Sequence, residues 1–395
     1  MYYLNQCGIV CALGASRSEV RHNLFALERS GVQPTDRWSP GRQLALGAVA
    51  QDLKLPDLEN RPLQQRSRNN QLALAALAQI RPEVDAAIAQ FGAQRIGVVI
   101  GTSTSGIDST EGAMRQYRQS GKLPPEFHYA QQELGSPAQL LSDELGLSGP
   151  AYVHSSACSS SGKAFASAAR LIKMGLCDAV ICGGVDTLCE FTVAGFSALE
   201  SVSVERCNPL SVHRNGINIG EGAALFLMSK NRAEVALCGW GESSDGYHMS
   251  APEPQGLGAR MAIEQALQRA GIGAQQIDYI NLHGTATVQN DAMEAKVIHD
   301  LFGTQVPVSS TKPFTGHALG AASAIEAALC WLTMQQAESA PRLPAHLWDG
   351  AADPALPVLH TVVSGYRHTR PLQWILSNSF AFGGSNAALV LGKMP

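Results

Sequence analysis

The sequence lacks the excess of basic residues by which nucleic-acid-binding proteins attract their ligands. Its 29 Lys and Arg residues are outnumbered by 33 Asp and Glu residues, so the formal net charge is −4. Charged residues make up only 16% of the chain, whereas hydrophobic residues make up 45%. We therefore expect no nucleic-acid partner and an extensive core, with packed layers or a partner subunit covering much of the surface.

Paired cysteine motifs and membrane-spanning segments are also missing. No paired C-x-x-C spacing occurs, which argues against zinc and dithiol sites, and the odd number of cysteines predicts reduced thiols in a cytoplasmic protein. The longest apolar stretch, residues 318–334, contains Glu326 near its middle, so we predict a buried helix and no membrane span. The first basic residue is Arg17, which argues against a signal peptide. The cysteines are at positions 7, 11, 158, 177, 182, 189, 207, 238 and 330.

Short apolar runs alternate with helical patterns along the whole chain. Residues 95–100, 178–186 and 278–282 are typical of buried strands, and residues 259–270 and 317–334 are predicted helices. This alternation indicates an α/β architecture and is compatible with an internal duplication. Because no linker is evident, we expect one compact unit.

One stretch combines a strand, a turn and a helix around a cysteine. Residues 150–153 are predicted as a strand, small residues surround Cys158, and helical periodicity begins after Gly162. Unpaired amide N–H groups and the positive end of a helix dipole favour a thiolate at such a position. The stretch is typical of a nucleophile elbow. Taken alone it fits an inert buried thiol equally well, because free cysteine is often buried.

Three later stretches place polar residues after apolar strands, where α/β folds tend to hold their sites. They are residues 281–287 (NLHGTAT), 309–317 (SSTKPFTGH) and 378–386 (NSFAFGGSN). Each also has an ordinary interpretation, as a structural histidine, a surface lysine or a glycine turn. A buried Glu326 needs a charged partner, and Lys312 is the candidate.

Together the four motifs resemble those of the elongating β-ketoacyl-carrier-protein synthases of the thiolase superfamily. The motifs occur in that family's order and approximate spacing over nearly the whole chain, and the finer likeness is to the ketosynthase of aryl polyene biosynthesis. The resemblance implies a thiolase-like α/β fold, with duplicated βαβ halves in a five-layered αβαβα arrangement. Residues 1–235 would carry the nucleophilic cysteine, and residues 236–395 the two histidines and the lysine.

The resemblance also implies a decarboxylative Claisen condensation. Cys158 would hold the acyl chain as a thioester, while His283 and His317 would donate hydrogen bonds to the thioester carbonyl of malonyl carrier protein as CO₂ leaves. Lys312, balanced by Glu326, would orient the imidazoles and keep them neutral. The product would be a β-ketoacyl carrier protein longer by two carbons. No metal or dissociable cofactor is implied, because the phosphopantetheine arm belongs to the acyl carrier protein.

Further roles are implied in the same way. The N–H groups of Cys158 and Phe382 would form the oxyanion hole, and Phe382 with Phe380 would gate the acyl pocket. Thr285 and Thr287 would bind the pantetheine arm. The residues expected to dock the acidic carrier protein are Arg66, Arg68 and Arg206, for which solvated arginines are the alternative interpretation.

Two positions depart from the family's usual pattern. Ser156 stands where Thr is common, and Ala381 stands where Gly is common and adds a methyl group to the gating loop.

Other members of the superfamily remain as alternatives. A thiolase needs a second cysteine near its C-terminus, and none follows Cys330. A catalytically silent chain-length-factor-like subunit typically lacks the nucleophile, whereas this chain retains Cys158. We therefore expect the active member of a heterodimer with such a homologue, or of a homodimer; another condensing enzyme of fatty-acid synthesis is the remaining alternative.

Overall fold

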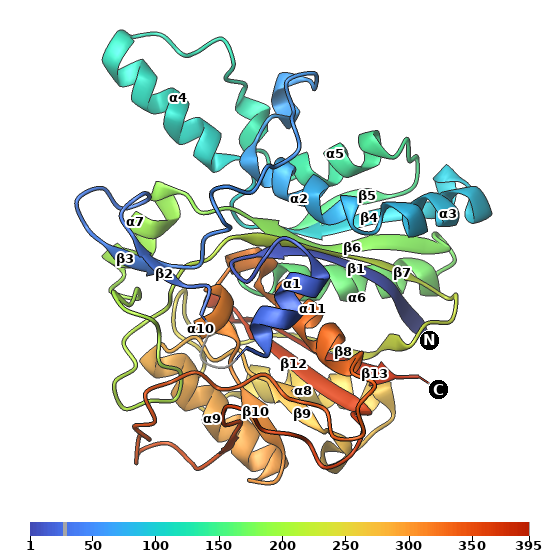
Figure 1. The fold of residues 1–395 in the computed structure, drawn as a ribbon, viewed down its shortest axis with the longest axis vertical. Helices are drawn as coiled ribbons and strands as arrows, with labels where there is room; N and C mark the ends of the chain where they lie inside the picture. Colours follow the sequence, from blue (N-terminus) through green and yellow to red (C-terminus); the bar gives the residue numbers. More distant parts are fainter. Residues whose placement is uncertain (27–29, 395) are drawn as a thin grey trace.

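Eleven strands form one hydrogen-bonded series in the computed structural model, which describes residues 1–26 and 30–394 (Figure 1). The order is β11-β10-β9-β12-β13-β8-β1-β7-β6-β4-β5. In the first half of the chain the strands are β1 (Tyr2–Cys11), β4 (Ile96–Gly101), β5 (Ala151–His154), β6 (Ala179–Asp186) and β7 (Gly222–Ser229). In the second half they are β8 (Val235–Ser244), β9 (Tyr279–Asn281), β10 (Pro307–Ser309), β11 (His360–Thr361), β12 (Trp374–Phe380) and β13 (Ser385–Lys393).

The two halves of this series have the same topology. The order β5-β4-β6-β7-β1 in the first half corresponds to β10-β9-β12-β13-β8 in the second. In both, the first three strands are parallel and the last two are antiparallel to their neighbours. The halves meet where β1 pairs with β8 through Tyr2 and Tyr3. This repeated order confirms the internal duplication.

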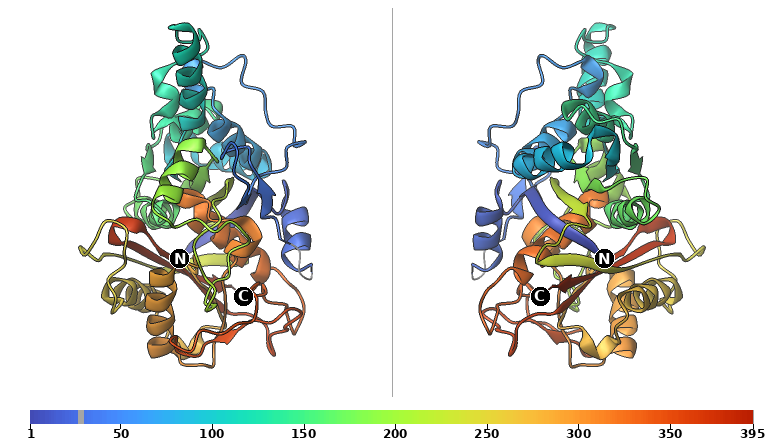
Figure 2. Two further views of the ribbon diagram at one scale, coloured as in Figure 1. Left: turned by 90° about the vertical axis from the view of Figure 1, so that its left-hand side faces the viewer. Right: turned by 90° about the vertical axis from the view of Figure 1, so that its right-hand side faces the viewer.

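Helices lie between the halves and on their outer faces (Figures 1 and 2). The inner layer is α6 (Ser160–Lys173) and α11 (Ala322–Met334), which contact strands of both halves. Outside the first half lie α2 (Arg68–Ala78), α3 (Arg81–Phe91) and α5 (Ser136–Glu144), and outside the second lie α8 (Leu257–Ala270) and α9 (Val288–Phe302). This αβαβα layering confirms the predicted fold class. The boundary between residues 235 and 236 stays a prediction.

The remaining elements connect these layers. Helix α4 (Ile107–Ser120) projects at the top of Figure 1, and within it only Ala113 is buried. It is a single helix of 14 residues. The others are α1 (Arg17–Leu24), α7 (Glu190–Ala198), α10 (Lys312–Thr315), β2 (Gln33–Thr35) and β3 (Leu44–Leu46), with 3₁₀ helices η1 (Leu63–Gln65), η2 (Ala93–Arg95), η3 (Tyr129–Gln132), η4 (Ala274–Gln276), η5 (Leu319–Ala321) and η6 (Phe382–Gly384).

The apolar stretch at 318–334 forms a buried helix that starts later than predicted. Every residue of α11 is buried. The α-helix begins at Ala322 and not at His317, because Leu319 has a φ of 47° and the Ala321 N–H donates to Asp186. Within the described residues, no helix has the length and apolar character needed to cross a membrane.

Candidate active site

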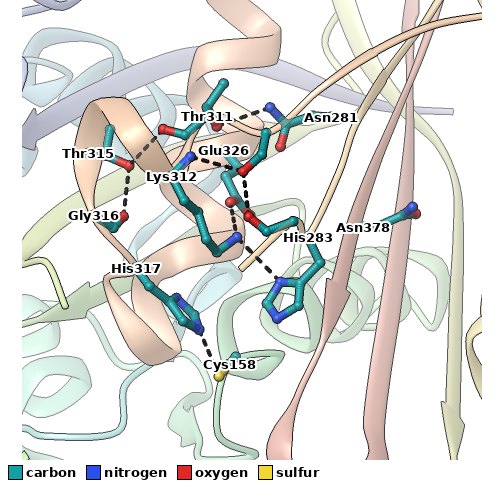
Figure 3. A network of polar contacts seen from close by, with 12 residues as sticks. Cys158, Asn281, His283, Thr311, Lys312, Thr315, Gly316, His317, Glu326 and Asn378 are labelled. Atoms are coloured by element: carbon teal, nitrogen blue, oxygen red, sulfur yellow. Dashed lines mark hydrogen bonds and ion pairs between the residues drawn. The ribbon is translucent and has the colours of Figure 1, made fainter. Parts of the chain in front are cut away.

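Reactive side chains from both halves meet beyond the carboxyl ends of the parallel strands (Figure 3). Cys158 follows β5, His283 follows β9, and Lys312 and His317 follow β10. Cys158 Sγ lies 3.0 Å from His317 Nε2, and Lys312 Nζ lies 3.3 Å from His283 Nδ1. The two imidazole rings are 5.3 Å apart between centroids and nearly perpendicular. The four residues that the sequence placed in three separate motifs therefore form one cluster.

A strained turn presents the cysteine. Ala157 adopts a left-handed conformation with a φ of 49°, two residues before the N-cap Ser159 of α6. Ser160 holds the turn by donating from Oγ to the carbonyl of Ala157 at 2.5 Å and accepting from the N–H of Ser156 at 2.9 Å. Non-glycine residues in this conformation are uncommon and cluster at functional sites. The elbow predicted from the sequence is confirmed as a strand–turn–helix unit.

Burial opposes the tendency toward a thiolate that the helix start predicts for Cys158. Burial raises the pKa of the Cys158 thiol to about 11, although Lys312 and the N–H groups of Phe382 and Cys158 lower it. Burial destabilises the thiolate by more free energy than the nearby positive charge and amide dipoles contribute to stabilising it. The thiol needs a proton acceptor when it reacts, and His317 Nε2 is the adjacent base.

Both imidazoles are neutral, as predicted. Burial lowers the pKa of His283 and of His317 well below the usual range, and the charge of Lys312 lowers each further. Burial is the larger cause, whereas the sequence argument named only the lysine. Because the Lys312 ammonium can only donate, His283 Nδ1 must accept, which leaves the ring proton on Nε2.

The predicted partnership of Lys312 and Glu326 is confirmed. Lys312 Nζ lies 2.5 Å from Glu326 Oε1, and both side chains are 2% exposed. Burial raises the pKa of Glu326, against the opposing effect of Lys312. This ion pair fixes the ammonium that bonds to His283.

Glu294 has a structural role that sequence analysis did not assign. Its carboxylate on α9 accepts the N–H groups of His283 at 2.8 Å and of Gly284 at 2.7 Å. Burial raises its pKa to about 7. Glu294 lies 11 residues after His283, and this closeness in sequence was the only signal for the contact.

A cavity of about 260 Å³ opens onto the cluster, lined by Cys158 and both histidines together with the predicted pantetheine residues. Thr285 and Thr287 join each other there through their hydroxyls at 2.9 Å. The Phe382 ring is also in the lining, and its centroid lies 5.7 Å from that of the Phe196 ring. The centroids of the Phe380 and His283 rings are 6.1 Å apart.

The three arginines predicted to dock a carrier protein lie outside this cavity lining. Arg68 forms two hydrogen bonds with the fully buried carboxylate of Glu221, at 3.0 and 2.5 Å, so its charge is engaged inside the protein. Arg66 donates from Nε to the carbonyl of Arg61, and Arg206 is partly exposed.

One metal-compatible group occurs among the described residues. Ligand atoms of Cys158, His283 and His317 all lie within 4.8 Å of one another. Sulfur and imidazole ligands suit zinc, but the same atoms are the ones a condensation requires. The expectation of no metal and no cofactor stays a prediction.

Family models match most of the chain. The model for the beta-ketoacyl synthase N-terminal domain matches residues 10–233, and that for the C-terminal domain matches residues 234–346. The chain belongs to the beta-ketoacyl synthase family. Its relatives include Nodulation protein E of Rhizobium meliloti, 31% identical over 98% of each chain. Another is 3-oxoacyl-[acyl-carrier-protein] synthase 2 of Staphylococcus aureus (strain COL), 30% identical over 85% of this chain and 84% of the relative.

A solved structure shares the fold of this beta-ketoacyl synthase. It is the ketosynthase ApeO in complex with its chain length factor ApeC from Xenorhabdus doucetiae, with a TM-score of 0.93 and 45% identity over 100% of this chain and 98% of that one. The predicted family and the thiolase-like fold are thereby confirmed. The protein is a condensing enzyme that extends acyl chains, and the silent chain-length-factor role is not favoured.

Proposed function

We propose that this ketosynthase extends aryl-polyene-type acyl chains by decarboxylative condensation with malonyl carrier protein. The observation that carries the proposal is the cluster of one thiol and two neutral imidazoles, of which one touches Cys158 and the other Lys312. The likeness to ApeO over the whole chain supports the substrate class.

In the first step Cys158 takes the acyl chain. Its sulfur attacks the thioester carbonyl of an acyl carrier protein, the C–S bond to pantetheine breaks, and a new thioester forms. The thiol proton passes through His317 Nε2, 3.0 Å away, to the departing pantetheine sulfur. The N–H groups of Cys158 and Phe382 would stabilise the oxyanion, and their closeness to Sγ, whose pKa they lower, supports this role.

In the second step malonyl carrier protein loses CO₂. Once Cys158 is acylated it no longer donates to His317, so the His317 ring can carry its proton on Nε2; the Nε2–H groups of His283 and His317 then donate to the malonyl thioester oxygen. The C–C bond to the carboxylate breaks, and its electron pair becomes that of an enolate. Neutral donors suit this step because they stabilise the developing charge without giving up their protons. The enolate carbon then attacks the acyl-cysteine, and the C–S bond to Cys158 breaks with its electron pair on sulfur. The sulfur takes up a proton from solvent to restore the thiol, and the β-ketoacyl carrier protein leaves.

The chemistry, the surface and the likeness to ApeO support two protein partners. An acyl carrier protein is required by the chemistry, and Arg66 and Arg206 remain as docking residues; Arg68 is occupied by Glu221. Helix α4 and the segment after it expose Tyr117 and Tyr129, at 47% and 66%, as a second subunit would require. The ApeO complex supports a chain-length-factor homologue as that subunit, with a homodimer as the alternative. We place the enzyme in the cytoplasm, where its free thiols stay reduced.

Reconstitution tests the proposal. The enzyme is mixed with malonyl carrier protein and an aryl-polyene acyl carrier protein, alone and with a chain-length-factor homologue, and product masses are measured. We expect a β-ketoacyl product longer by two carbons that is lost with Cys158→Ala. CO₂ release without extension, in the presence of the partner, would contradict the proposal.

A further inference from the structure

His346 is a buried histidine that lies outside the cavity lining and is bonded to two separate loops. It is 4% exposed. Its Nδ1 accepts from the N–H of Ser310 at 3.1 Å, and its Nε2 lies 2.9 Å from the carbonyl of Pro209. Since the Ser310 amide can only donate and the Pro209 carbonyl can only accept, one neutral tautomer satisfies both bonds. Nothing in the chemistry of the cavity requires a histidine here.

The first loop connects His346 to the catalytic histidine. Ser310 donates from Oγ to the carbonyl of Gly284 at 2.6 Å, directly after His283. The same oxygen accepts the N–H of Lys312 at 3.3 Å. Gly284 has a φ of 41°, and a Cβ there would lie 2.6 Å from Ser310 Cβ, so the Gly284 backbone lies tightly against the Ser310 side chain. Ser310 therefore joins the segments that carry His283 and Lys312.

The second loop reaches the other end of the His283 segment. Leu210, next to Pro209, donates its N–H to Asp291 Oδ2 at 2.8 Å. Asp291 Oδ1 accepts the N–H of Ala286 at 3.2 Å. The segment 283–286 is thus supported on one side through Ser310 and on the other through Asp291, and both supports end on the ring of His346.

We infer that His346 is a positioning residue for malonyl decarboxylation, whose neutral ring joins the two supports of the His283 segment and so fixes His283 against Lys312. The inference rests on the proposed role of His283 in that step. Burial lowers the pKa of His346 to about 4, so the ring keeps its acceptor at neutral pH. Acylation of Cys158 uses the elbow and His317 and not His283, so it should depend much less on His346.

The test separates the two half-reactions. Acylation of Cys158 by an acyl carrier protein is followed in a single turnover, and CO₂ release from malonyl carrier protein is followed without an acyl donor. For His346→Phe, which keeps a ring but loses both bonds, we expect the kcat of CO₂ release to fall about 10- to 100-fold. The KM for malonyl carrier protein and the acylation rate should stay within about threefold.

Two conservative variants assign the effect to one bond. His346→Asn keeps an acceptor at the position of Nδ1, and His346→Gln keeps a donor that reaches Pro209. We expect H346N to retain more CO₂ release than H346Q, because Ser310 is the direct link to Gly284 and Lys312. This comparison also decides the matter if His346→Phe does not fold. Equal rates for H346N and H346Q, or the reverse order, would overturn the inference.

His368 provides a matched control. It is also buried, at 8% exposure, and bonds through Nδ1 to the carbonyl of Arg370 at 2.9 Å, but it has no connection to Ser310 or Pro209. His368→Phe should lower stability without changing the ratio of the two rates. If His346→Phe lowered the rates of Cys158 acylation and CO₂ release equally, His346 would have only a structural role. Absence of CO₂ release from the wild-type enzyme would instead refute the proposed function itself.

Discussion

The two halves of the molecule place different chemistry at the same topological position. After β5 the chain turns through Cys158 into α6, and after the equivalent strand β10 it passes Lys312 and His317 into α11. Small serine and alanine residues surround the cysteine, whereas a buried ion pair lies behind the histidines. The first half thus offers the nucleophile with its own backbone N–H, and the second offers the N–H of Phe382, a buried charge and neutral imidazoles. The duplicated fold thus brings together Cys158, which holds the acyl chain, and the histidines, which stabilise the enolate. Neither half contains both groups.

The largest expected effect comes from removing the nucleophile of the first half. Cys158→Ala should abolish chain extension, by at least about 10³-fold in kcat, because no other side chain of the cluster can form the acyl-enzyme. CO₂ release from malonyl carrier protein should persist in part, since it depends on the second half. Product mass and CO₂ release measure the two activities. Cys238→Ala, which alters a thiol in β8, is the control; parallel loss of both activities in Cys158→Ala would contradict the division of labour.

The reciprocal change removes a donor from the second half. His283→Ala should lower CO₂ release about 10²- to 10³-fold, as expected for the loss of one donor to a developing oxyanion. Acylation of Cys158, measured by mass spectrometry of the intact protein, should continue. Unchanged CO₂ release would break the assignment of His283.

The buried pair of the second half should dominate stability. Lys312→Met leaves the Glu326 carboxylate without its partner, and such a loss costs about 3–5 kcal/mol of unfolding free energy. Denaturant unfolding measures the change. Lys296→Met breaks an exposed pair with Asp300 and should cost no more than about 1 kcal/mol. Equal losses for the two variants would mean that the 2% exposure of Lys312 and Glu326 has no energetic consequence.

The pH dependence of alkylation tests the state of the thiol. With the pKa of Cys158 raised to about 11, the thiolate fraction, and with it the iodoacetamide rate, should rise about tenfold per pH unit from pH 7 to 10. A thiolate stabilised by the helix dipole would instead react at a rate that is flat over this range. A plateau beginning near neutral pH would restore the interpretation made from the sequence.

Sequence predicted the parts of the site that depend on order and local pattern. The strand–turn–helix unit around Cys158 and the pairing of Glu326 with Lys312 are examples, because an isolated carboxylate on an apolar helix needs a cation. Sequence analysis did not predict the features that depend on tertiary packing. Burial of Cys158 outweighs the helix dipole, and α11 starts at Ala322 because the preceding turn is bonded to Asp186. The partner of Arg68 is 153 residues away, beyond any local signal.

The smallest effects are expected from substitutions of Arg66 and Arg68, which lie near the surface of the first half. Arg66→Glu should raise the KM for carrier-protein substrates several-fold and spare small thioester mimics, because complementary charge at an interface acts mainly on association. Arg68→Glu should act differently, since it places a second carboxylate against buried Glu221 and therefore lowers the melting temperature. Steady-state kinetics with both substrate types and thermal unfolding separate the two outcomes. If Arg66→Glu slows the small thioester as much as the carrier-bound substrate, Arg66 does not dock the carrier protein.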